Sequence, residues 1–193
     1  MGDPVRRDTS KRLWYSIINI NGNGGLGELM GQHKRLLLQP STEKVTAIPH
    51  CNGLDYWIIG SRGNSNQFYS WLLDSDSLHQ NSAVISQSGT GNNGRGAQKA
   101  GFLKPSHDGT IICEVIGYHH ANLHSFNAER GVVFDGQQLI SSNEIEAIYG
   151  CEFSANNSKL YFTGYSTYQM DLWAGDIDDI KNSLTLLSTT ING

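Results

Sequence analysis

The sequence predicts an all-β fold, a β-propeller of about three and a half four-stranded antiparallel blades that form an incomplete ring. Three observations lead to this prediction: a repeat of roughly 50 residues, the same tight-turn signal in each repeat, and a composition unfavourable to helices. The 193 residues include 22 glycines and 4 prolines, and 38% of them are hydrophobic. Glycine, serine and asparagine weaken helices, so this composition favours short strands joined by polar turns.

Three segments of the sequence align with one another. They begin at Val45, Ala100 and Ile148, and each starts with a short strand. A dipeptide that is typical of a two-residue hairpin turn follows that strand. These dipeptides are Asn52-Gly53, Asp108-Gly109 and Asn156-Asn157. The same turn signal at the same place predicts that each segment is one structural unit.

Each turn leads into a second apolar strand, which ends on a glycine in all three segments. These strands read DYWIIG, TIICEVIG and KLYFTG. A loop and a third strand follow, and the pairs Asn127 with Gly131 and Asp171 with Gly175 mark a turn into a fourth strand. Four antiparallel strands in each repeat are the plan of a propeller blade, as in WD40-like repeats.

The repeats define the predicted domain organisation. Residues 1–12 are predicted as a flexible tail and residues 13–188 as a partial propeller. The propeller divides into a half blade at 13–40 and full blades at 43–88, 98–141 and 146–189. An open arc leaves apolar blade faces uncovered. We therefore expect the remaining blades of a longer parent chain, or self-association, to cover those faces.

Six motifs spread along the chain are together typical of one protein family. They are YSIIN, NGGLGEL, EKVTAIPHCNGLDYWII, GFLKPSHDGT, YGCEFSANNSKLYFT and YQMDLWAGDI. In these motifs the chain resembles the propeller region of large secreted bacterial surface proteins, the type that carries a type IX secretion sorting domain. The resemblance implies a β-propeller, an extracellular or cell-surface location, and a role in adhesion or recognition. It brings no catalytic residue set. The turns SHDG and SANN depart from the family because each lacks the usual proline.

Composition argues against several classes of function. The net charge is −4, and the main basic cluster lies in the first 12 residues, so nucleic-acid binding is not expected. The three cysteines, Cys51, Cys113 and Cys151, are too scattered for a zinc site or a disulfide framework. No segment is apolar enough to span a membrane, and the opening residues do not read as a signal peptide.

Clusters of possible metal ligands have simpler interpretations. His119 and His120 read as solvated loop residues, and His124 begins a strand that it shares with Phe126. The acidic run Asp176–Asp179 lacks the glycine and glutamate of a calcium loop and reads as a solvated turn. We therefore predict no catalytic residues, no metal and no cofactor. The alternative is a lactonase-like or lyase-like propeller enzyme with an axial metal site.

The loop after the second strand recurs in all three segments and is the predicted binding surface. Equivalent loops of successive blades gather on one face of a propeller, where polar side chains on a rigid scaffold suit a polar ligand. The candidate ligand-binding residues are Arg62, Asn64, Asn66, His119, His120, Asn122, Tyr165 and Tyr168. The predicted function is non-enzymatic binding or scaffolding, with a protein or a glycan as the possible ligand.

Overall fold

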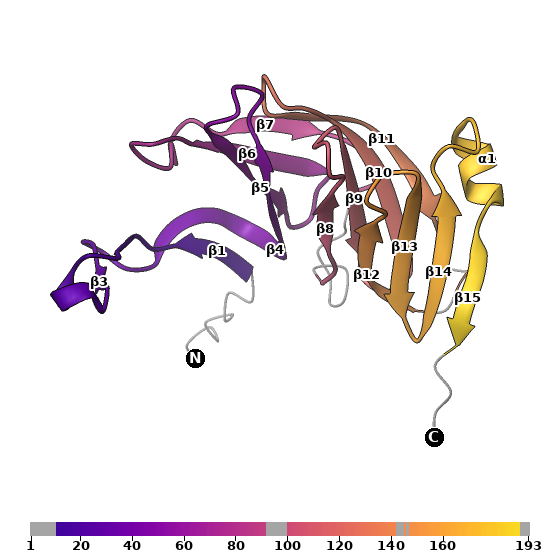
Figure 1. Cartoon of the computed structure of the whole chain (residues 1–193), viewed down its shortest axis with the longest axis horizontal. Coiled ribbons are helices and arrows are strands. Elements are labelled where there is room, and N and C mark those ends of the chain that lie inside the picture. The colour runs from indigo at the N-terminus through magenta and orange to yellow at the C-terminus, as the bar shows by residue number, and fades with distance from the viewer. Residues whose placement is uncertain (1–10, 92–99, 142–144, 146, 190–193) are drawn as a thin grey trace, which may run out of the picture.

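The computed structural model describes residues 11–91, 100–141, 145 and 147–189. These residues form antiparallel sheets, with one short helix, α1 (Ile177–Asn182), and one 3-10 turn, η1 (Asn23–Gly25). The sheets stand next to one another along an open arc (Figure 1). The prediction of an all-β, propeller-like arc of antiparallel sheets is confirmed.

The first sheet contains five strands in the order β1-β4-β5-β6-β7. Their bounds are β1 (Lys11–Tyr15), β4 (Arg35–Pro49), β5 (Tyr56–Arg62), β6 (Gln67–Leu73) and β7 (Val84–Gln87). Strand β4 pairs with β1 through its first part and with β5 through its second part, and Ser41 lies opposite Lys11 on one side and Arg62 on the other. The stretch predicted as a half blade therefore joins the sheet of the following blade through one continuous strand.

The N-terminal stretch differs from the prediction at the end of the predicted tail. Residues 1–10 of the predicted tail lie outside the described residues, but Lys11 and Arg12 begin β1, where Lys11 pairs with Ser41 of β4 and Arg12 Nε donates to Gln39 Oε1 at 2.8 Å. Between β1 and β4 the chain forms a small hairpin of β2 (Ile18–Asn19) and β3 (Glu28–Leu29). Lys11 and Arg12 are therefore strand residues, because β4 supplies a partner for them that the local sequence does not reveal.

The second and third sheets contain four strands each, in the orders β11-β10-β9-β8 and β12-β13-β14-β15. The second sheet comprises β8 (Leu103–Pro105), β9 (Ile111–Ile116), β10 (His120–Asn127) and β11 (Val132–Ile140). The third comprises β12 (Ile148–Phe153), β13 (Lys159–Gly164), β14 (Ser166–Asp171) and β15 (Thr185–Thr189). The predicted turn residues Gly53, Gly109 and Asn157 have φ values of 71°, 70° and 59°, the left-handed conformation that such turns require.

The acidic run near the C-terminus starts a helix. The Asp176 side chain accepts hydrogen bonds from the backbone N–H groups of Asp178 and Asp179, which makes Asp176 the N-cap of α1. An aspartate at this position satisfies backbone donors that the helix leaves unpaired, and its charge is favourable there. The run is therefore a helix cap where the sequence predicted a solvated turn.

The core of the protein lies between successive sheets. Between the first and second sheets, Ile48, Trp57 and Phe68 pack with residues of β9 and β10. Between the second and third sheets, Val115 and Phe162 belong to a separate buried cluster. Each sheet is thus apolar on the side that meets its neighbour, as side-chain alternation along a strand requires.

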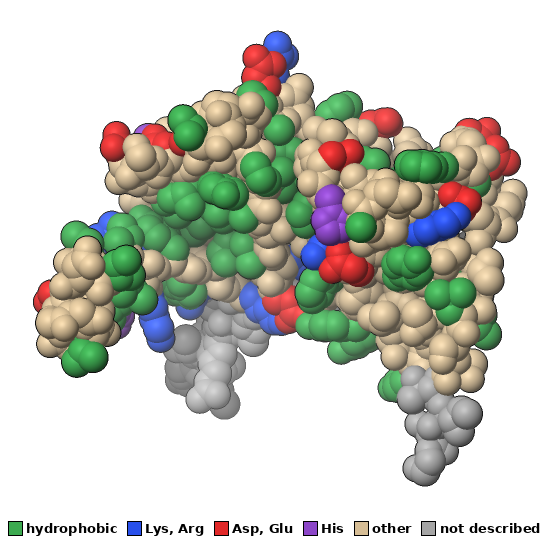
Figure 2. All heavy atoms as spheres, in the orientation of Figure 1, with side chains coloured by type: hydrophobic (Ala, Val, Ile, Leu, Met, Phe, Trp, Pro, Cys, Tyr) green, Lys and Arg blue, Asp and Glu red, His purple; other side chains and the backbone are tan. Residues whose placement is uncertain are grey.

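The two outer faces of the arc differ in character. The outer face of the first sheet is apolar and carries Val45, Tyr56 and Ile85, which are 47%, 47% and 54% exposed. Hydrophobic side chains gather visibly over this part of the surface (Figure 2). The outer face of the third sheet carries mostly polar residues, which are Glu152, Lys159, Tyr161, Thr163, Thr167, Gln169 and Asp171. No helix among the described residues is long and apolar enough to cross a membrane.

Candidate functional site

The loop between β5 and β6 carries three of the eight predicted ligand-binding residues. Arg62 Nη1 donates to Gln67 Oε1 at 3.0 Å, so its guanidinium is held against its own sheet. Asn66 Nδ2 donates to the backbone oxygen of Gly89 at 3.4 Å. Asn64 is exposed and has a φ of 66°. Hydrogen bonds to Gln67 and Gly89 thus hold two of these side chains, and ligand binding by all three stays a prediction.

Of the other five predicted residues, two are buried, two are exposed, and His120 is half-buried. Asn122 is wholly buried, where its Oδ1 accepts from Thr90 Oγ1 at 2.9 Å and its Nδ2 donates to the Thr90 carbonyl at 3.1 Å. Tyr168 is 8% exposed and belongs to the core between the second and third sheets. These two side chains contribute to packing between sheets. His119 and Tyr165, in contrast, are exposed and line one cavity.

This cavity, which we call the tyrosine cavity, lies where the loop after β9 meets β12 and the end of β13. Its volume is about 490 Å³. The residues that line it are Tyr118, His119, Ala147, Ile148, Tyr149, Gly164 and Tyr165. The tyrosine rings remain open to solvent, at 42% for Tyr118, 44% for Tyr149 and 71% for Tyr165. The second and third sheets together therefore present three aromatic rings around one hollow.

Tyr149 is the most firmly held of these rings. Its hydroxyl donates to Glu43 Oε1 at 2.9 Å, and the same carboxylate accepts from Lys11 Nζ at 2.7 Å and from the Gly101 N–H at 3.2 Å. The hydrogen bond to Glu43 raises the pKa of Tyr149, so its hydroxyl stays protonated. The ring of Phe102 packs edge-on against Tyr149, with 6.4 Å between ring centroids. Glu43 thus ties the cavity to the first sheet.

Burial and hydrogen bonding act in opposite directions on Glu43. Burial would raise the pKa of its carboxyl, but the hydrogen bonds from Lys11 and Tyr149 outweigh that effect and lower it. At neutral pH the carboxylate of Glu43 is therefore ionised while the phenol of Tyr149 is neutral. In this pair the Tyr149 hydroxyl is always the donor and the Glu43 carboxylate always the acceptor.

Sequence reasoning missed Tyr118 and Tyr149 as residues of this site. Tyr149 lies two residues before Cys151, which is buried against the second sheet, but a register shift between Ile148 and Gly150 interrupts the side-chain alternation of β12 at this point. The sequence does not reveal that shift. The contact between Tyr149 and Tyr118, whose ring centroids are 6.3 Å apart, likewise depends on the packing of two sheets.

A buried polar network joins the first and second sheets. Lys44 Nζ lies 2.9 Å from Glu114 Oε1, and His124 Nε2 lies 3.5 Å from Glu114 Oε2. His124 Nδ1 and the Ser88 hydroxyl are 2.9 Å apart, and the Phe68 ring meets the imidazole edge-on at 4.9 Å. Burial would raise the pKa of Glu114, but the charge of Lys44 and the contact with His124 lower it to about 2. The carboxylate therefore stays charged inside the protein.

The histidines of the GYHHANLH segment do not converge. His119 is exposed, His120 is half-buried at the start of β10, and His124 is 1% exposed in the network described above. Within the ranges that the structure describes, no group of three or more His, Cys, Asp or Glu residues is placed to hold a metal ion.

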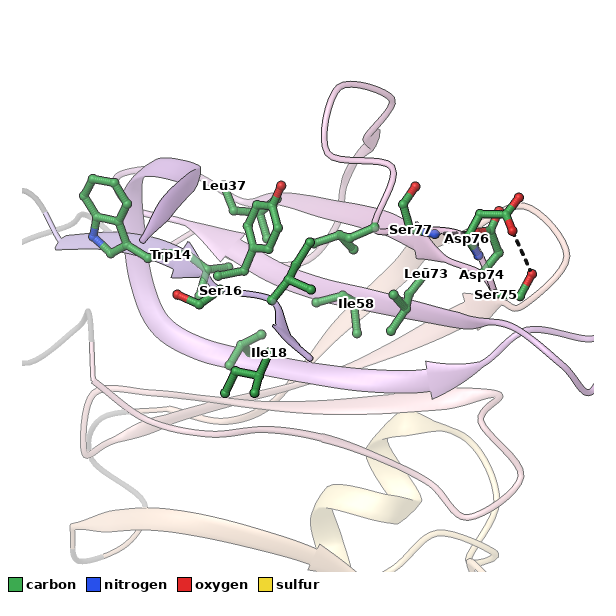
Figure 3. Close-up of a pocket in the computed structure, with 15 residues that line it drawn as sticks. Trp14, Ser16, Ile18, Leu37, Ile58, Leu73, Asp74, Ser75, Asp76 and Ser77 are labelled. Carbon is green, nitrogen blue, oxygen red and sulfur yellow. Dashed lines mark hydrogen bonds between the residues drawn. The ribbon is translucent and has the colours of Figure 1, made fainter. Parts of the chain in front are cut away.

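A second hollow, the N-terminal groove, lies between the N-terminal strands and the outer face of the first sheet. Its volume is about 610 Å³. Ile18, Ile58 and Leu73 occupy its middle, while Asp74 and the residues after it form a polar rim at one end (Figure 3). Eight aliphatic side chains make up most of its apolar lining, and Trp14 and Tyr15 add two aromatic rings. The N-terminal groove is therefore mainly aliphatic, whereas three tyrosines dominate the lining of the tyrosine cavity.

Comparison with known proteins identifies the fold alone. No protein-family model matches the chain, and no curated protein matches it. Among solved structures, the chain is similar to a candidate 6-phosphogluconolactonase from Bacteroides uniformis, with a TM-score of 0.55 and 12% identity over 90% of this chain and 49% of that chain. It is also similar to a candidate 6-phosphogluconolactonase from Bacteroides fragilis, with a TM-score of 0.52 and 11% identity over 95% of this chain and 56% of that chain. The fold is therefore propeller-like, and the chain spans about half the length of these structures.

Proposed function

We propose that the chain is a non-enzymatic recognition module that holds its ligand in the tyrosine cavity. The observation that supports this proposal is the gathering of Tyr118, Tyr149 and Tyr165 around one hollow of about 490 Å³, with their rings open to solvent. Ligand pockets in proteins have volumes of about 300–1,000 Å³ and combine apolar walls with a few polar groups. Tyr149 is on β12, and Tyr118 and Tyr165 lie in short connections between strands. Aromatic rings held in such places offer contact area at a low cost in conformational entropy.

Location and partners stay predictions that rest on the sequence. The resemblance to secreted bacterial surface proteins favours an extracellular or cell-surface setting, in which a recognition module would bind a protein or a glycan. Coverage of the N-terminal groove, by the remaining blades of a parent chain or by another copy, is likewise a prediction. Its support is the apolar lining of that groove and the shorter length of this chain relative to similar propeller structures.

The experiment that tests recognition is an array of oligosaccharides and peptides probed with the labelled 193-residue chain. We expect at least one ligand whose binding is lost in the double variant Tyr149→Ala/Tyr165→Ala. The matched control is Tyr56→Ala, which removes a tyrosine of similar exposure from the outer face of the first sheet. That variant should bind as the unmodified chain does.

Two results would contradict the proposal. One is a ligand that the double variant binds as tightly as the unmodified chain does. The other is hydrolysis of a sugar lactone by the purified chain, which would favour the alternative of a lactonase-like enzyme. The sequence already left that alternative open, and the two similar structures, both candidate 6-phosphogluconolactonases, are compatible with it.

A further inference from the structure

We propose that the ligand of the tyrosine cavity is a neutral saccharide, an inference that rests on the proposed recognition function. The first support is the charge of the lining. Among the described residues, the seven that line it include no Asp, Glu, Lys or Arg, and of these seven His119 alone has an ionisable nitrogen. These side chains offer no charged partner to a phosphate, a carboxylate or an ammonium group, and desolvating such a group without a partner is costly. The lining thus favours an uncharged ligand.

The second support is the arrangement of the rings. Tyr118 and Tyr149 lie with their ring centroids 6.3 Å apart and their planes tilted by 32°, and each leaves more than two fifths of its surface open. The face of an aromatic ring carries partial negative charge. The C–H groups on one face of a pyranose ring carry partial positive charge, so a sugar can stack on such a surface. A saccharide ring therefore matches the shape and polarity of the tyrosine faces.

The third support is the hydrogen-bonding state of Tyr149. Its proton is directed to Glu43 Oε1 at 2.9 Å, so its oxygen offers a ligand only a lone pair. The ligand must then supply a donor at that point. A sugar hydroxyl is such a donor, whereas a proline-rich peptide, which also stacks on tyrosines, has no N–H at its prolines. This contact distinguishes the two classes of ligand and favours the saccharide.

The experiment is titration calorimetry of the 193-residue chain with four classes of probe. They are neutral hexasaccharides (β-1,4-glucan, β-1,3-glucan, β-1,4-xylan and α-1,4-glucan), an acidic hexagalacturonate, a cationic hexaglucosamine and a proline decamer. We expect at least one neutral hexasaccharide to bind. Its affinity should fall about tenfold or more in Tyr149→Ala and in Tyr165→Ala, since each removes a ring that stacks on the sugar. Circular dichroism confirms that each variant is folded, and Tyr56→Ala is the control.

A conservative variant tests the role of the Tyr149 hydroxyl. Tyr149→Phe keeps the ring but removes its oxygen and releases it from Glu43, so we expect a loss in affinity smaller than that of Tyr149→Ala but measurable. Binding of only the charged probes or the proline decamer, lost in Tyr149→Ala, would overturn the inference of a neutral saccharide and leave the recognition function standing. Binding of no probe, or binding that neither tyrosine variant weakens, would overturn both.

Discussion

At the scale of single residues, a buried lysine, glutamate and histidine meet where the first and second sheets pack. The side chains of Lys44 and Glu114 are 0% and 4% exposed, and the two charges are each other's main compensation. An ion pair in such a place contributes little net stability when intact, but removing one partner leaves the other charge buried without compensation. The network therefore adds little to the free energy of unfolding while it is intact, but the loss of one of its charged members would lower that free energy strongly.

We expect Glu114→Ala to lower the free energy of unfolding by about 3–5 kcal/mol, because it leaves the ammonium of Lys44 uncompensated. The matched control is Glu152→Ala, whose carboxylate pairs with Lys104 at 2.8 Å on the surface. Exposed pairs contribute about 0–1 kcal/mol, so this variant should be nearly neutral. Urea denaturation followed by tryptophan fluorescence measures both values. Equal losses in the two variants would show that the buried pair has no special role.

At the scale of elements, the turn between β10 and β11 is joined to the first sheet by Trp57. The indole N–H of Trp57 donates to the Ala128 carbonyl at 2.8 Å, and the ring lies against Gly131, where an added Cβ would be 2.8 Å from ring carbons. Gly131 also has a φ of 68°. Glycine is therefore required there both by the backbone conformation and by the neighbouring ring.

Two glycine variants separate these effects. Gly53→Ala places an alanine in the same backbone conformation, at φ 71°, with no atom within 4 Å of its Cβ. It should cost about 1–2 kcal/mol, the penalty for a left-handed alanine. Gly131→Ala adds a clash with the Trp57 ring and should cost about 1–3 kcal/mol more. Thermal denaturation measures the difference, and equal melting temperatures for the two variants would argue against the ring contact.

The same elements show what the sequence could and could not predict. Signals that act within a few residues were reliable, since the turns at Gly53, Gly109 and Asn157 adopt the conformations that hairpin geometry requires. Pairing between distant residues was not predictable in this way. Strand β4 is continuous because β1 and β5 both pair with it, and the tyrosine cavity forms because β12 packs beside β9. Local patterns identify strands, but the contacts between sheets define the site.

At the scale of the whole molecule, the apolar outer face of the first sheet contrasts with the polar outer face of the third. We expect the N-terminal groove to bind anilinonaphthalene sulfonate, a dye that fluoresces on apolar surface. Ile58→Asp should lower that fluorescence because it places a charge among the aliphatic residues of the groove. Thr163→Asp, on the outer face of the third sheet, should leave it unchanged. An equal decrease of fluorescence in both variants would show that the dye does not bind in the N-terminal groove.

Because one outer face is apolar and the other is polar, the two ends of the arc are not equally suited to the addition of a designed blade. A designed blade fused ahead of β1 would find aliphatic surface ready to bury, so its own apolar face would gain a partner. A blade fused after β15 would have to cover the side chains of Glu152, Lys159 and Asp171, at the cost of removing charged groups from water. Designed arrays built from this chain should therefore be lengthened at the β1 side and left uncovered at the β15 side, where the polar face already acts as a soluble cap.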